Sequence, residues 1–164
     1  MIKIVITVFI FLLILDGCSS KNLINKKNQE SAFIVLKTPT MRYADMGFIY
    51  KSDSFVKVEI YSMGQPVVNL DINGMNVCMS TFKCMEKKDF NAKMLSSTYP
   101  DTLLENIFQS KPIFDGENLE KDSKGFNQNI VKKGQYDINY SVQGNKTKFK
   151  DRKNRIIIGI TIKK

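Results

Sequence analysis

The sequence lacks the residues that most enzymes use for acid–base and metal chemistry. It contains no histidine, which is the side chain that most often acts as a general base or metal ligand near neutral pH. No GxSxG segment, phosphate-binding loop or clustered carboxylate motif occurs in it either. We therefore expect a protein that is not an enzyme and that works without a cofactor or a metal ion.

The sequence has no apolar run long enough to span a membrane, and its longest apolar run lies at the start of the chain. Residues 4–15 are almost continuously apolar, but they fall short of the ~20 residues that span a bilayer. This length fits the core of a signal peptide better than a membrane-anchoring helix. The run ends in Leu15-Asp16-Gly17-Cys18, which resembles the lipobox of bacterial lipoproteins. The sequence thus predicts a signal peptide at residues 1–17 and a covalent lipid on Cys18.

A polar segment follows the predicted lipidation site. Residues 18–31 are rich in Asn and Lys and lack sustained periodicity, which is typical of a flexible tether. The residue after Cys18 is Ser19, and not the Asp that commonly retains lipoproteins at the inner membrane of enteric bacteria. We expect a lipoprotein of the bacterial outer membrane. Its single folded domain, residues 32–164, is expected to face the periplasm as a monomer.

Cysteine is scarce, with three residues in the whole chain. Besides Cys18, the sequence has Cys78 and Cys84, which flank a short segment with the pattern of a strand, a turn and a strand. In an oxidising envelope, two such thiols most simply form a structural disulfide. The alternatives are two reduced thiols or a redox pair, although the spacing is not CxxC and a metal site would lack further soft ligands.

Acidic residues are fewer than basic residues. The chain has 16 Asp and Glu against 25 Lys and Arg, a formal net charge of +9. A basic domain tethered outside the cytoplasm is expected to meet lipid headgroups or other anionic envelope components rather than nucleic acid. The alternative is a basic surface that is simply solvated, and no basic run in the sequence is dense enough to decide between them.

Apolar residues alternate with polar ones over most of residues 32–164. Ile156, Ile158, Ile160 and Ile162 share one face of a predicted strand. This alternation predicts half-buried antiparallel strands joined mainly by hairpins. The other segments predicted as strands are 32–37, 41–50, 56–60, 68–72, 76–79, 81–85, 126–132, 136–142 and 146–150.

Two short helices interrupt the strands. Helical spacing of apolar residues occurs in 87–97 and again in 102–109, and Asp101 is placed to cap the second helix. The fold class is therefore mainly β with two short helices. Either the sheet packs on a second sheet in an immunoglobulin-like sandwich, or it curls and the helices cover its open side. Periodicity leaves this choice open.

The order of these elements resembles the LolB family of outer-membrane lipoprotein receptors. The resemblance lies in FVKVEIYSMGQPVVNLDI, LLENIFQSKPIFDGENL and GFNQNIVKKGQYDINYSV, followed by a C-terminal strand. It implies a curved, incomplete antiparallel β-barrel, like that of the carrier LolA, with a helical lid over an apolar cavity for acyl chains. It also implies that the protein accepts lipoproteins from a LolA-type periplasmic carrier and places them in the outer membrane, without a cofactor.

Met63 and Gly64 form the centre of the connector between two predicted strands. Turns are normally polar, and Gly64 supplies the backbone freedom that a tight turn needs. In the LolB family the corresponding loop projects an apolar residue that inserts cargo into the membrane, so the resemblance assigns this role to Met63. The alternative is a Met that folds back over the hydrophobic edge.

The resemblance also directs attention to the apolar faces as a cavity for acyl chains, although each of these residues is equally suited to an ordinary core. The cavity candidates are Val58, Ile60, Leu70, Ile72, Leu104, Ile107, Phe108, Ile138, Tyr140, Ile158 and Ile160. Two other functions stay open. A sandwich fold would favour a structural or adhesive surface module, and a LolB-like fold is compatible with another lipid cargo.

Overall fold

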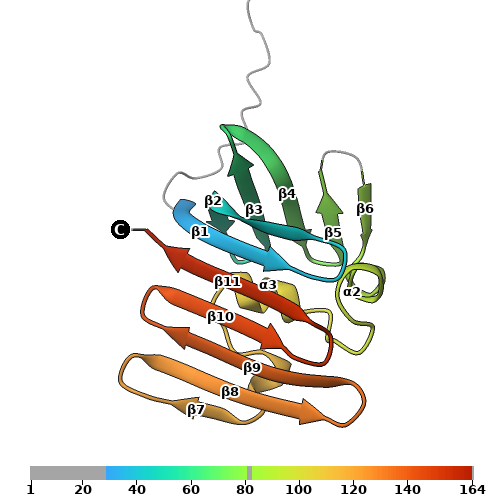
Figure 1. The fold of residues 1–164 in the computed structure, drawn as a ribbon, viewed down its shortest axis with the longest axis vertical. Coiled ribbons are helices and arrows are strands. Elements are labelled where there is room, and N and C mark those ends of the chain that lie inside the picture. Colours follow the sequence, from blue (N-terminus) through green and yellow to red (C-terminus); the bar gives the residue numbers. More distant parts are fainter. Residues whose placement is uncertain (1–28, 81–82, 164) are drawn as a thin grey trace, which may run out of the picture.

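A computed structural model describes residues 29–80 and 83–163. In this part of the chain, eleven strands form one antiparallel sheet in the order β6-β5-β4-β3-β2-β1-β11-β10-β9-β8-β7 (Figure 1). The elements are β1 (Gln29–Lys37), β2 (Arg42–Lys51), β3 (Phe55–Ser62), β4 (Gln65–Asn73), β5 (Asn76–Met79), β6 (Lys83–Glu86), α2 (Lys87–Met94), α3 (Leu103–Phe108), the 3-10 turn η2 (Phe114–Gly116), β7 (Leu119–Lys121), β8 (Gly125–Lys132), β9 (Tyr136–Gln143), β10 (Lys146–Asp151) and β11 (Ile156–Ile162).

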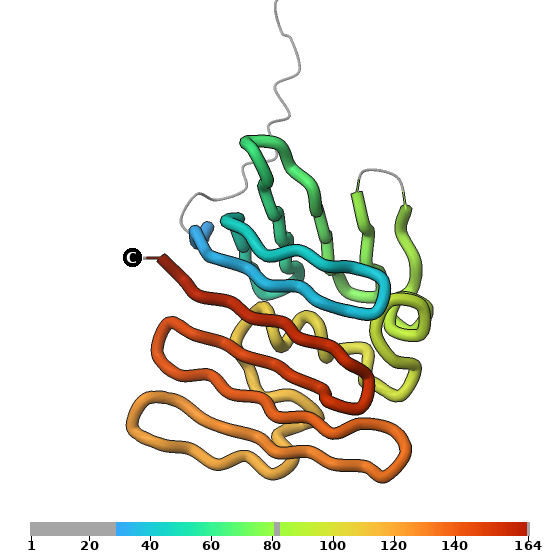
Figure 2. Tube along the Cα trace, in the orientation of Figure 1, coloured from blue at the N-terminus to red at the C-terminus, as the bar shows by residue number. Residues whose placement is uncertain are grey.

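The sheet consists of two meanders that meet in its middle. Strands β1 to β6 pair in sequence order, strands β7 to β11 do the same, and β1 pairs with β11. Helices α2 and α3 lie between the two meanders in sequence, and Figure 2 shows α3 passing behind the sheet. The prediction of a mainly β fold with two helices and a large antiparallel sheet is confirmed. The immunoglobulin-like alternative is wrong, because the described strands form one hydrogen-bonded sheet and helices cover its inner face.

The strand alternation determines which side chains are buried. In β11, Ile156, Ile158 and Ile160 are at most 3% exposed, whereas Ile157 and Gly159 between them face the other side of the sheet. We call the side of the sheet with the buried residues the inner face. The core on this face is mainly aliphatic along β1 to β4 and aromatic along β8 to β10, where the rings of Tyr99 and Phe149 lie 6.1 Å apart.

A glycine between two strands and a buried carboxylate at a loop each constrain the local structure. At Gly47 in β2, an added Cβ would collide with the carbonyl oxygen of Glu59 in β3, so only glycine allows the strands to approach this closely. The buried Asp151 accepts backbone N–H bonds from Asp137, Lys153 and Asn154, and the Tyr99 hydroxyl donates to it at 2.5 Å. Burial, followed by this bond to Asp151, raises the pKa of Tyr99.

The boundaries of several elements differ from the predicted ones. Strand β1 begins at Gln29, inside the segment predicted as tether, because residues 29–31 pair with residues 48–50 of β2. The first helix ends at Met94 rather than at residue 97, since Ser96 and Thr98 hydrogen bond to each other. Asp101 does not cap α3, whose N-cap is Thr102 and has no side-chain cap bond. The short strand β7 is additional to those predicted.

Candidate functional site

The turn between β3 and β4 presents Met63 to solvent. Ser62 pairs with Gln65, so Met63 and Gly64 alone form the loop, with φ values of 50° and 77°. Two positive φ values are typical of a type I′ hairpin turn, which favours Asn-Gly. For another L-residue, this conformation costs about 1 to 2 kcal/mol. The Met63 side chain is fully exposed at 101% and does not fold back over the sheet.

The surroundings of Met63 make an apolar tip. Pro66 and Val67, on the β4 side of the turn, are also exposed, and the β3–β4 hairpin projects at the top of the molecule in Figure 1. A second exposed methionine, Met75, lies beyond the other end of β4 and is 76% exposed. The two methionines therefore lie beyond opposite ends of β4. Because a strand rises about 3.3 Å per residue, they are about 30 Å apart along it.

A polar cluster stabilises the base of this hairpin on the outer side of the sheet. The Glu59 carboxylate contacts Lys57 Nζ at 2.8 Å and accepts bonds from the hydroxyls of Tyr50, at 3.2 Å, and Tyr61, at 3.1 Å. Burial acts to raise the Glu59 pKa, but the bonds from Lys57 and the two tyrosines outweigh it and hold the pKa below its ordinary value. Burial and the Glu59 charge raise the pKa of Tyr50 to about 12.

The predicted cavity residues lie together in the core of the inner face, where each side chain is at most 3% exposed. They come from four parts of the fold: the β3–β4 pair, helix α3, strand β9 and strand β11. The structure places Val58, Ile60, Leu70, Ile72, Leu104, Ile107, Phe108, Ile138, Tyr140, Ile158 and Ile160 in this cluster. These side chains belong to one core cluster, to which α3 contributes Leu104, Ile107 and Phe108.

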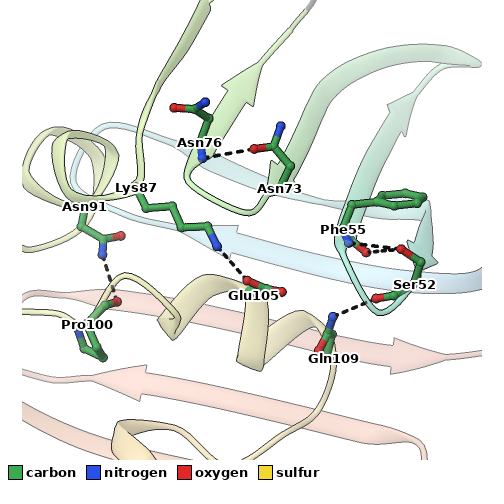
Figure 3. A network of polar contacts seen from close by, with 9 residues as sticks. All are labelled: Ser52, Phe55, Asn73, Asn76, Lys87, Asn91, Pro100, Glu105 and Gln109. Atoms are coloured by element: carbon green, nitrogen blue, oxygen red, sulfur yellow. Dashed lines mark hydrogen bonds and ion pairs between the residues drawn. The ribbon is translucent and has the colours of Figure 1, made fainter.

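A few polar contacts connect the helices to each other and to the sheet (Figure 3). Lys87 at the start of α2 is 6% exposed and contacts Glu105 of α3 at 2.8 Å. Gln109 donates to the carbonyl of Ser52 in the β2–β3 loop at 3.3 Å. The hydroxyls of Ser110 and Thr147 lie 2.7 Å apart and connect the end of α3 to β10. The Tyr140 hydroxyl of β9 also donates to the carbonyl of Lys111, just after α3, at 2.9 Å.

The cysteines occupy different parts of the chain. Cys78 in β5 and Cys84 in β6 are directly opposite each other and form a disulfide across the edge hairpin. Cys18 lies outside the described residues, as does the predicted signal peptide, so lipidation stays a prediction. Among the helices of the described residues, none is both long and apolar enough to cross a membrane.

The outer face carries a cationic strip that the sequence analysis did not identify. In β10, Lys146, Lys148 and Lys150 point outward and alternate with the buried Thr147, Phe149 and Asp151. The three lysines alternate with other residues in the segment KTKFKD. Whether they lie on the exposed side depends on which face of the strand points inward. Alternation therefore locates the strand without showing that its three lysines gather on one exposed surface.

A shallow groove of about 430 Å³ lies beside these lysines. Its lining includes Phe33 and Val35 of β1, Ile157, Gly159 and Thr161 of β11, and Lys148 of β10. Gly159 lies between Val35 and Lys148 in the strand register, and its missing side chain leaves the space. This groove is on the outer face and is separate from the predicted acyl cavity.

The sequence was compared with protein-family models and with curated proteins. The chain matches no family model, and no curated protein matches it.

Proposed function

We propose that the protein is a lipid-anchored receptor of the LolB type, which takes lipoproteins from a periplasmic carrier and inserts them into the outer membrane. The observation that carries this proposal is Met63, a fully exposed apolar side chain at a backbone position that favours Asn or Gly. Neither the turn nor the core benefits from a methionine there. Insertion into acyl chains would gain roughly 1.5 to 3 kcal/mol.

The inner face supports the second part of the proposal, which is the binding of the cargo's acyl chains. We propose that the curved sheet acts as an incomplete barrel and that α2 and α3 act as its lid. When α3 moves away, the side chains of Leu104, Ile107 and Phe108 leave the core and acyl chains take their place against the strands. This movement involves a short helix, since α3 spans six residues, and it breaks few polar contacts.

Lipoprotein transfer tests the proposal directly. The lipidated full-length protein is placed in vesicles, a LolA-type carrier loaded with a lipoprotein is added, and the lipoprotein that floats with the vesicles is measured. We expect transfer by the wild type and its loss in Met63→Glu. Met75→Glu is the matched control, since it places the same charge on the other exposed methionine, and it should transfer like the wild type.

Two results would contradict the proposal. No transfer by the wild type, with a carrier competent toward a known receptor, would rule out the receptor function and leave another lipid ligand or a surface-binding module. Unimpaired transfer by a folded Met63→Glu variant would exclude the insertion role of the turn.

A reversible lock tests the lid. Because the Ser110 and Thr147 hydroxyls lie 2.7 Å apart, cysteines at both positions are placed to form a disulfide that holds α3 against β10. The oxidised double variant should fail to accept cargo and recover on mild reduction. Wild type treated with the same reductant controls for loss of the Cys78–Cys84 disulfide. Equal transfer by the locked and reduced forms would show that α3 does not open.

A further inference from the structure

We propose that the outer face of β1, β2, β10 and β11 is a second membrane-contact surface, which lies against an anionic bilayer. This inference rests on the proposed function in one respect, that the domain is anchored at a membrane. The residues that carry it are distinct from the Met63 turn and from the inner face. We call this surface the basic outer face, with Lys146, Lys148, Lys150, Lys37, Phe33 and Met46 as its main residues.

The charge on this face is not balanced by neighbouring carboxylates. The β11 residues opposite Lys146, Lys148 and Lys150 are Thr161, Gly159 and Ile157. On the other side, the same three lysines face Gln143, Ser141 and Asn139 of β9. None of the three lysines takes part in an ion pair with a described residue. Because alternate residues of a strand are about 6.6 Å apart, the three charges repel one another and the fold gains nothing from grouping them.

Apolar side chains adjoin the lysines on the same face. Phe33 and Met46 are directly opposite each other in the β1–β2 register and are 38% and 39% exposed. The groove over Gly159 separates this pair and Val35 from Lys148. One surface thus presents cations beside exposed apolar groups, which matches the combination of anionic headgroups and acyl chains at a bilayer surface.

The position of the face favours a bilayer over an acidic protein partner. Strand β1, which contributes Phe33 and Lys37, is the first described element after the predicted tether, so the anchor would deliver this part of the sheet to the lipid surface. The cations and the apolar residues are spread over neighbouring strands of one sheet instead of surrounding a deep pocket. A lysine near an anionic lipid surface contributes about a fivefold increase in affinity, so three lysines bias the orientation of the anchored domain strongly.

A tryptophan reporter tests this inference, because the chain contains no tryptophan. The lipidated Phe33→Trp protein is reconstituted in neutral phosphatidylcholine vesicles and in vesicles with added phosphatidylglycerol. Only in the anionic vesicles do we expect a blue shift of emission and quenching by brominated acyl chains, both reversed by high salt. Met46→Trp on the neighbouring strand is a second reporter if Phe33→Trp does not fold.

Matched variants identify the cause of the signal. The triple change Lys146→Gln, Lys148→Gln, Lys150→Gln should abolish the quenching, whereas Lys121→Gln, Lys132→Gln, Lys133→Gln, which removes the same charge elsewhere, should not. Met75→Trp, at an exposed site beyond the end of β4 and away from this face, should stay unquenched. An unquenched reporter in anionic vesicles, or quenching that survives the first triple change, would overturn the inference.

The same samples separate this inference from the proposed function. Flotation of the protein with neutral vesicles reports the lipid anchor, and lipoprotein transfer in neutral vesicles reports the receptor activity. If the reporters stay unquenched while anchoring and transfer persist, the membrane-contact surface is wrong and the receptor proposal stands. If the reporters are quenched while transfer fails, the surface stands and the receptor proposal does not.

Discussion

Two hairpin turns of the same length differ in what their residues do for the fold. In the β9–β10 turn, Gly144 has a φ of 58°, and the Asn145 side chain donates to the carbonyl of Ile162 in β11 at 2.9 Å. In the β3–β4 turn, Met63 has a φ of 50° and is wholly exposed. The first turn is tied to its neighbouring strand, whereas the second carries a residue that its backbone disfavours. This difference indicates that Met63 serves something other than stability.

The largest effect is expected when Met63 is replaced by the residue that its turn favours. Met63→Asn should lower lipoprotein delivery to vesicles about 10- to 100-fold, which corresponds to the free energy of burying one methionine in acyl chains. Asn145→Met places a methionine in the other turn and should leave delivery unchanged. Delivery by Met63→Asn at the wild-type rate would mean that the two turns do not differ in function.

The next largest effect concerns the backbone, and here the two turns should behave alike. Gly64→Ala and Gly144→Ala each place a side chain at a positive φ, so each should lower the free energy of unfolding by about 1 to 2 kcal/mol. Urea denaturation of both variants measures this change. A loss at only one of the two positions would show that the other turn changes its conformation to accept alanine.

Smaller changes of opposite sign should follow from the side chains at the turns. Asn145→Ala removes the bond to Ile162 and should destabilise the protein by about 1 kcal/mol. Met63→Asn relieves the unfavourable φ and should stabilise it by about 0.5 to 1 kcal/mol. The midpoints of urea denaturation measure both changes. A destabilised Met63→Asn variant would show that Met63 supports the fold after all.

The smallest effect is expected on acidification. Since the Glu59 pKa lies below its ordinary value of 4.5 in the folded protein, its contribution is complete above pH 4.5 and is lost as the pH falls through the folded-state pKa. Amide exchange in β3–β4 should therefore increase relative to that in β9–β10 at low pH. Asp122 beside the β9–β10 hairpin also has a lowered pKa, first through its bond from Gln143, but it is fully exposed and water screens it.

Matched substitutions test this acid response. Glu59→Gln should remove the pH dependence of the exchange ratio between the two hairpins, and Asp122→Asn should leave it nearly unchanged. If Asp122→Asn has the larger effect, the cluster around Glu59 does not control the base of the β3–β4 hairpin.

Much of the local structure was predictable because it depends on neighbours in the chain. The alternation in RIIIGITIK identified both a strand and its buried face, and Ser62-Met63-Gly64-Gln65 identified a turn with an unexpected apolar residue. Boundaries were less predictable where a distant strand decides them. Gln29 belongs to β1 because it pairs with Tyr50 of β2, and the residues near Gln29 do not indicate this pairing.

The candidate sites also differ in whether neighbouring residues in the chain were enough to predict them. Met63 was identified from its own segment, and its exposure follows from the short turn that holds it. The basic outer face was missed because its parts are far apart in sequence: Phe33 belongs to β1 and Lys148 to β10, and β11 lies between these strands. A residue pattern describes each strand alone and does not state which strand lies beside it.

By itself, the sequence determined the strand periods, the two helices and the residues of the turns, because local sterics and the alternation of side chains act within a few residues. Only the tertiary structure decided that one sheet forms, that β1 pairs with β11, and that helices cover one face while lysines gather on the other. These features depend on pairing between residues more than a hundred positions apart, such as Ile34 with Ile160. Such pairing is selected by the burial of the whole core.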